Sequence, residues 1–181
     1  MSRLFQTAFA SICLLCLAPA SQARDFDATT EAQIDTDADA ALSNLYASVP
    51  GSQGVISRAA GVLVFPRSGF IVGGQHGGGA LRVGGNSVGY YYTDRMTYDV
   101  NPSARNHAVA IAFMTKEALQ RLQASADWNV GADASVAVVK TGAGGMAAAS
   151  KPDKPVQIFV FGDNGLVDPT AMAGAKITKV G

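Results

Sequence analysis

The chain has 181 residues, enough for one domain, and 48% of them are hydrophobic whereas 15% are charged. This composition predicts an ample core and excludes a largely disordered chain. The 14 basic and 14 acidic residues balance to a formal charge of zero. A balanced charge offers no electrostatic argument for nucleic acid, and we expect no nucleic-acid partner.

The first 23 residues have the pattern of a signal peptide. Arg3 supplies the positive start, the apolar run AFASICLLCL follows, and Ser21-Gln22-Ala23 forms a small-x-small cleavage site. The apolar run is too short to span a bilayer as a helix. We therefore expect cleavage after Ala23 and export to the periplasm or the periphery of a bacterial envelope.

Both cysteines, Cys13 and Cys16, lie within this leader, so the mature chain is expected to have no disulfide and no thiol. A lipoprotein is the alternative, because a cysteine can be the acylated residue. The preceding residues, Ile12 and Leu15, are not the small residues that a lipobox requires. The pattern therefore favours cleavage without lipidation.

Residues 24–60 predict a helical segment. One face of residues 24–49 is apolar, formed by Ile34, Ala38, Ala41, Leu42, Leu45 and Val49. The polar face carries Asp35, Asp37 and Asp39, whereas helices that lie on membranes usually carry Lys and Arg there. Packing on a sheet is therefore favoured over binding of this helix to a membrane. Pro50-Gly51 ends the helix, and a shorter helix is expected at 53–60.

Residues 61–92 are glycine-rich and read GVLVFPRSGFIVGGQHGGGALRVGGNSVGYYY. Short runs of β-branched and aromatic residues are cut by glycines, which is typical of strands joined by tight turns. After them, Thr93-Asp94-Arg95 predicts a turn, 96–100 an extended piece and 101–103 a loop.

The second half predicts further strands and one helix. HAVAIAFMT at 107–115 is apolar nearly throughout, which indicates a central strand, and Thr115 is suited to cap a helix at 116–126. We expect Trp128 in a loop that covers one end of the core. The remaining predictions are strands at 134–139 and 156–161, an exposed and mobile loop at 141–153, a turn at 162–165, and an extended end at 176–180.

These elements predict one α+β domain. We expect a twisted, mostly antiparallel sheet that can curl toward a barrel, with the N-terminal amphipathic helix and a second helix packed on it. Residues 1–23 are the leader, 24–60 the helical segment and 61–181 the β-rich core, the last two forming one domain.

Two motifs resemble catalytic or cofactor signatures. Ser87 lies in a G-x-S-x-G pattern, but a nucleophile elbow needs a following helix, and Tyr90-Tyr91-Tyr92 predicts a strand, so a turn between strands is favoured. Residues 142–147 match G-x-G-x-x-A, yet fewer than two helical turns fit before Pro152, which disfavours dinucleotide binding. His76 and His107 lack partner ligands. We expect no catalytic residue, no metal and no cofactor.

Several blocks of the sequence resemble the SYLF-domain family. They are GVLVFPR, then GF-VGGQ-G-GALRVGG-SVGYYY, then VAIAFMT with a helix and W-VG-DASV-VV, and finally KITKV, spanning roughly residues 60–180. A Gly/Gln-rich stretch of many relatives, similar to SYGLQAGAQ, is replaced here at 97–106. The resemblance implies phospholipid binding, notably of phosphoinositides, with actin binding in some fungal relatives and no enzymatic activity.

The resemblance suggests a partner and candidate contacts. We expect a non-enzymatic phospholipid-binding protein of the envelope that acts at a membrane surface, with an envelope scaffold or protein-interaction module as the alternative. From residue 61 onward the sequence contains eleven basic and eight acidic residues. The candidates for contact with lipid phosphate are Arg58, Arg67, Arg82, Arg95, Lys176 and Lys179. An envelope protein is the other partner considered.

Overall fold

The structure is a computed structural model that describes residues 28–66, 77–93, 107–149, 151–167 and 174–180. The predicted leader and the predictions for residues 94–103 lie outside these ranges. The helices are α1 (Ala28–Ser48), α2 (Ser52–Ile56) and α3 (Lys116–Ala124), with a short 3-10 turn at Ala143–Gly145. The strands are β1 (Gly61–Phe65), β2 (Gly78–Val83), β3 (Asn86–Thr93), β4 (Ala108–Phe113), β5 (Asp127–Asn129), β6 (Val136–Thr141), β7 (Ala147–Ala149), β8 (Val156–Gly162), β9 (Gly165–Leu166) and β10 (Lys176–Lys179).

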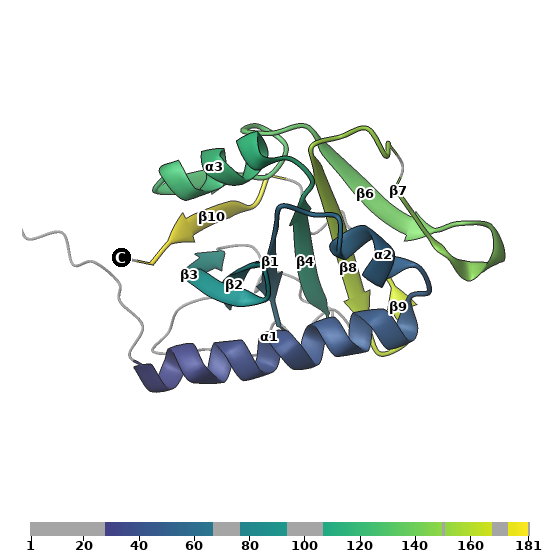
Figure 1. The fold of residues 1–181 in the computed structure, drawn as a ribbon, viewed down its shortest axis with the longest axis horizontal. Helices are drawn as coiled ribbons and strands as arrows, with labels where there is room; N and C mark the ends of the chain where they lie inside the picture. The colour runs from purple at the N-terminus through teal and green to yellow at the C-terminus, as the bar shows by residue number, and fades with distance from the viewer. Residues whose placement is uncertain (1–27, 67–76, 94–106, 150, 168–173, 181) are drawn as a thin grey trace, which may run out of the picture.

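The strands form one curled sheet between two helices. Their order is β5-β10-β3-β2-β1-β4-β8-β6-β7, and β9 pairs with β8. The named pairs are antiparallel except β6 with β8, which is parallel. Helix α1 crosses one side of the sheet and α3 lies on the other (Figure 1). The predicted α+β class, with a twisted and mostly antiparallel sheet, is confirmed.

Strand β4 shows how the two faces of the sheet differ. Successive side chains of a strand point to opposite faces. Toward α1, β4 presents only alanines, and toward α3 it presents Val109, Ile111 and Phe113. The small face leaves room for α1, whose buried stripe is Ile34, Ala38, Ala41 and Leu45. Full burial of Leu45 contributes roughly 1.5–3 kcal/mol to keeping the helix on the sheet.

The other face holds the larger core, which α3 closes. Thr115 caps α3 as predicted, because its side-chain oxygen accepts a hydrogen bond from the Ala118 backbone N–H at 3.2 Å. Leu119 and Leu122 pack against the larger side chains of the sheet. The central position of β4, between β1 and β8, is also as predicted.

Three local predictions require correction. Trp128 lies in β5 rather than in a loop, because its ring packs edge-on against Phe113 at 5.7 Å while its backbone pairs with Ile177. The stretch predicted as a mobile loop at 141–153 contains strand β7, which forms a hairpin with β6. Glycines at 144 and 145 adopt positive φ and build its turn. Helix α2 is shorter than predicted and ends at Ile56.

Candidate functional site

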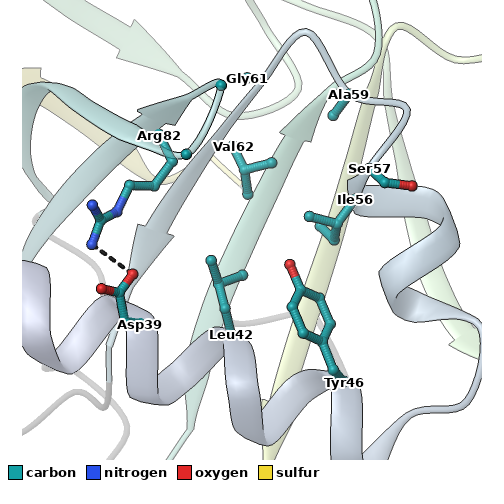
Figure 2. A pocket seen from close by; sticks show the side chains of 11 residues that line it. Asp39, Leu42, Tyr46, Ile56, Ser57, Ala59, Gly61, Val62 and Arg82 are labelled. Carbon is teal, nitrogen blue, oxygen red and sulfur yellow. Dashed lines mark hydrogen bonds and ion pairs between the residues drawn. The ribbon is translucent and has the colours of Figure 1, made fainter.

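A pocket of about 290 Å³ opens between helix α1 and the sheet. Its apolar lining comes from Leu42 and Tyr46 of α1, Ile56 of α2 and Val62 of β1. Figure 2 shows these side chains converging in the space between the helix and the strands. At one end of this space Arg82 of β2 reaches toward Asp39 of α1. The pocket therefore combines an apolar interior with an ion pair at its side.

The turn between β2 and β3 contributes to the lining of the pocket. Gly84 and Gly85 form a two-residue connection, and their φ angles of 59° and 88° are the left-handed values that such a hairpin turn requires. An added Cβ at either position would meet nothing within 4 Å, so the surrounding space is open. The two glycines thus line the pocket without side chains that would fill it.

Arg82 joins β2 to helix α1. One terminal nitrogen, Nη2, donates to Oδ1 of Asp39 at 2.7 Å and to the backbone carbonyl of Asp35 at 2.9 Å. The Arg82 side chain is only 12% exposed, whereas that of Asp39 is 70% exposed. In the described part of the chain, Nε of Arg82 is buried and has no hydrogen-bond partner. The guanidinium therefore has an unpartnered donor, Nε, that is shielded from solvent.

Asp35 organises a second set of contacts one helical turn before Asp39. Its carboxylate accepts hydrogen bonds from the hydroxyls of Ser87 and of Tyr90, the latter at 3.0 Å. Arg82 lies 3.7 Å from the same carboxylate. Burial, followed by the hydrogen bond and the charge of Asp35, raises the pKa of Tyr90 above its ordinary value. Tyr90 is therefore a neutral donor over the physiological range.

A β-bulge explains how Ser87 and Tyr90 reach the same carboxylate. They are three residues apart, so in a regular strand they would point to opposite faces. The register shifts between Leu81, which pairs with Gly89, and Arg82, which pairs with Ser87, and this leaves Val88 without a partner. The extra residue turns both hydroxyls toward α1. Val88 itself is 48% exposed.

The sequence-predicted phosphate contacts do not share one surface. Arg58 follows α2 and is exposed, and Arg82 lies under α1. Lys176 and Lys179 are three residues apart in β10, so they point to opposite faces of the sheet. Arg67 and Arg95 lie outside the described residues. The role of these six residues in lipid binding stays a prediction.

Lys176 has a carboxylate close by. Its Nζ lies 2.8 Å from Oδ2 of Asp127. This hydrogen bond, followed by one from Thr178, lowers the pKa of the Asp127 carboxyl. Arg82 and Lys176 are thus both partly neutralised by acidic neighbours.

The sequence alone did not single out Asp35, Asp39 or Tyr46 as site residues. Asp35 and Asp39 follow directly after the buried residues Ile34 and Ala38, at the margin of the apolar stripe of α1. Carboxylates at such a margin lie near the sheet, and their i, i+4 spacing places them side by side. This spacing beside the apolar stripe is the feature of the sequence that could have indicated Asp35 and Asp39 as site residues.

The described ranges contain no group of three or more His, Cys, Asp or Glu residues that could hold a metal ion. Within the same ranges, no helix has both the length and the apolar character required to cross a membrane. In comparisons with known proteins, no family model and no curated protein matches the sequence.

Proposed function

We propose that the chain is a non-enzymatic phospholipid-binding protein of the bacterial cell envelope that acts at a membrane surface. The observation that carries this proposal is the pocket under α1, where apolar side chains meet the Arg82–Asp39 ion pair. A phospholipid has the same two parts, a charged headgroup and an apolar chain. Sites for small ligands typically combine an apolar lining with a few placed polar groups.

The family resemblance supports the same function from a different direction. Its most specific block, residues 61–92, includes strands β1 and β2 and all of β3 except its last residue. These strands and their turn supply Val62, Arg82, Gly84 and Gly85 to the pocket. The part of the chain that most resembles a lipid-binding family is thus the part that builds the sheet side of the site.

The size of the pocket favours a membrane-surface role over carriage of an enclosed lipid. A volume of about 290 Å³ lies just below the usual range for small-molecule sites, about 300–1,000 Å³. It suits a headgroup, or the first part of one acyl chain, better than a whole two-chain lipid. The rest of the lipid would stay in the bilayer, and the protein would bind at its surface.

The setting of Ser87 favours a non-enzymatic role. Ser87 lies within strand β3, after the Gly84-Gly85 turn, rather than between a strand and a helix as a nucleophile elbow requires. Its hydroxyl donates to Asp35, so it binds a carboxylate directly instead of a histidine base.

The proposed export to the periplasm rests on the leader pattern of residues 1–23.

Vesicle flotation of the full chain tests the proposal. We expect the protein to float with phospholipid vesicles at low salt. Any part of the binding that depends on exposed charges should weaken as salt rises, because salt screens such charges. A protein that stays at the bottom of the gradient at low salt, whatever the vesicle composition, contradicts the proposal.

An envelope scaffold is the second candidate, and the open sheet favours it. In the described part of the chain the strand order ends at β5 and β7, so neither end closes onto the other. Edge strands can pair with another chain. Cross-linking in intact envelopes that recovers one defined partner, together with absence of flotation, would support this candidate against the first.

A further inference from the structure

We infer that the pocket takes a zwitterionic headgroup that carries a primary ammonium and a phosphate, the phosphoethanolamine class. This inference rests on the proposed function and assigns the ligand chemistry of its site. The pocket presents one negative and one positive side chain next to each other, Asp39 and Arg82, joined at 2.7 Å. A ligand with both charges can place its positive group near Asp39 and its negative group near Arg82. A ligand with a single charge is attracted by one of these side chains and repelled by the other.

The ammonium side of the site is set by helix α1. The sequence of α1 has four carboxylates, including Asp35 and Asp39, and no lysine or arginine. Asp39 is the one that lines the pocket, and its side chain is well exposed. Arg82 contacts the Oδ1 atom of Asp39, and the 70% exposure of the Asp39 side chain leaves its carboxylate accessible to a second cation. The ring of Tyr46, in the same pocket, can contact a cation through its π face.

The phosphate side is set by Arg82. Its Nη2 is used by Asp39 and by the Asp35 carbonyl, but its Nε is buried without a partner. A buried donor without a partner is unfavourable, because it has lost its hydrogen bond to water and gained none from the protein. A phosphate in the pocket would face the 12% of the Arg82 side chain that is exposed, and it would reach Nε only after a movement of that side chain. The open turn at Gly84 and Gly85 provides space for the phosphate beside the guanidinium.

The charge near the pocket also argues against an anionic headgroup. Asp35, Asp39 and Arg82 sum to one net negative charge, and Asp37 and Glu31 add two more on the same helix. A phosphoinositide or phosphatidylglycerol headgroup would bring further negative charge to this face. The ligand preference inferred from the geometry therefore differs from the phosphoinositide preference that the family resemblance implies.

Two lipids with identical short acyl chains test the inference in the full-length protein. Calorimetric titration with phosphatidylethanolamine should give an affinity about fivefold tighter than titration with phosphatidylglycerol, the size expected for one partly exposed charge contact. Free phosphoethanolamine is titrated in parallel. Binding that needs the acyl chains identifies a lipid, and equal binding without them identifies a soluble ligand with the same headgroup chemistry.

Asp39→Asn tests the residue that carries the selectivity. It removes the ammonium contact and also releases Arg82, so phosphatidylglycerol should bind at least as well as phosphatidylethanolamine. Asp37→Asn removes the same charge from the same helix, but Asp37 does not line the pocket. It should keep most of the preference for phosphatidylethanolamine.

The outcomes separate the two proposals. Equal affinity of the wild-type protein for both lipids, or a preference for phosphatidylglycerol, overturns the headgroup assignment and leaves lipid binding intact. An equal loss of the preference for phosphatidylethanolamine in Asp39→Asn and Asp37→Asn also overturns the headgroup assignment. The preference would then come from the total negative charge of α1 rather than from a contact with Asp39. Binding to neither lipid overturns the assignment together with the proposed function.

Discussion

The contacts of Asp35 predict a specific cost for its neutralisation. Asp35→Asn keeps the size of the side chain but replaces a carboxylate that accepts from Ser87 and Tyr90 with a neutral amide. Hydrogen bonds to charged groups contribute about 1.5–3 kcal/mol each when well placed. The side chain of Asp35 is 32% exposed, so water screens part of this contribution. We expect a loss of about 2 kcal/mol in the free energy of unfolding.

Asp37→Asn is the matched control on the same helix. Asp37 accepts an exposed hydrogen bond from Gln33, four residues earlier, at 2.9 Å. Contacts of this kind contribute about 0.2–0.5 kcal/mol. Both variants remove one negative charge at similar positions along α1, so their difference isolates the contacts that Asp35 makes with the sheet.

Urea unfolding measures both variants, and a double-mutant cycle with Tyr90→Phe isolates one contact. The slope of the transition should stay constant while the midpoint moves. The coupling between Asp35→Asn and Tyr90→Phe should be about 1 kcal/mol, since contacting residues are not additive. Equal losses of unfolding free energy in Asp35→Asn and Asp37→Asn would refute the reasoning that the contacts of Asp35 with Ser87 and Tyr90 help to hold α1 on the sheet. A coupling energy of about zero between Asp35→Asn and Tyr90→Phe would refute it as well.

Two further predictions concern the core. Burial raises the pKa of Tyr91 to about 12, whereas the pKa of a tyrosine in an unfolded chain is about 10. Between these two pH values the Tyr91 hydroxyl stays protonated in the folded state and ionises in the unfolded state. The free energy of unfolding should therefore fall by up to about 3 kcal/mol as pH rises from about 10 to about 12. Urea unfolding at several pH values should show that this part of the fall disappears in Tyr91→Phe. The same dependence of unfolding free energy on pH in wild type and Tyr91→Phe contradicts the assignment. A Cβ at Gly79 would lie 2.5 Å from Cδ1 of Phe65 and 2.8 Å from the Val64 carbonyl oxygen. Gly79→Ala should cost about 1–3 kcal/mol in thermal unfolding, whereas Gly54→Ala, in α2 with open space, should be neutral or stabilising by up to about 1 kcal/mol; similar effects at both sites would contradict the close packing of β1 on β2.

The regular parts of the fold were predictable because their patterns are local. The apolar stripe of α1, the apolar run of β4 and the capping Thr115 each depend on neighbours in the sequence. Trp128 was misplaced because its strand has only three residues and is held by pairing with β10, which is distant in sequence. No local pattern reports such a partner.

The site was predicted only in fragments. Arg82 was named, but its partners Asp35 and Asp39 come from a helix more than forty residues earlier. Ser87 was noted for a catalytic motif that its strand does not support. The bulge at Val88, which directs Ser87 and Tyr90 to one carboxylate, depends on the register between β2 and β3. Such a register has no reliable signature in a single sequence.

The most direct test of the central claim is to fill the pocket and measure lipid binding. Leu42 lines the pocket, whereas Ala47 is exposed on the same helix, so Leu42→Trp and Ala47→Trp form a matched pair. Unfolding curves first establish that both variants are folded. Vesicle flotation should then show loss of binding in Leu42→Trp and wild-type binding in Ala47→Trp. Wild-type flotation of a folded Leu42→Trp protein would contradict the claim that this pocket binds phospholipid.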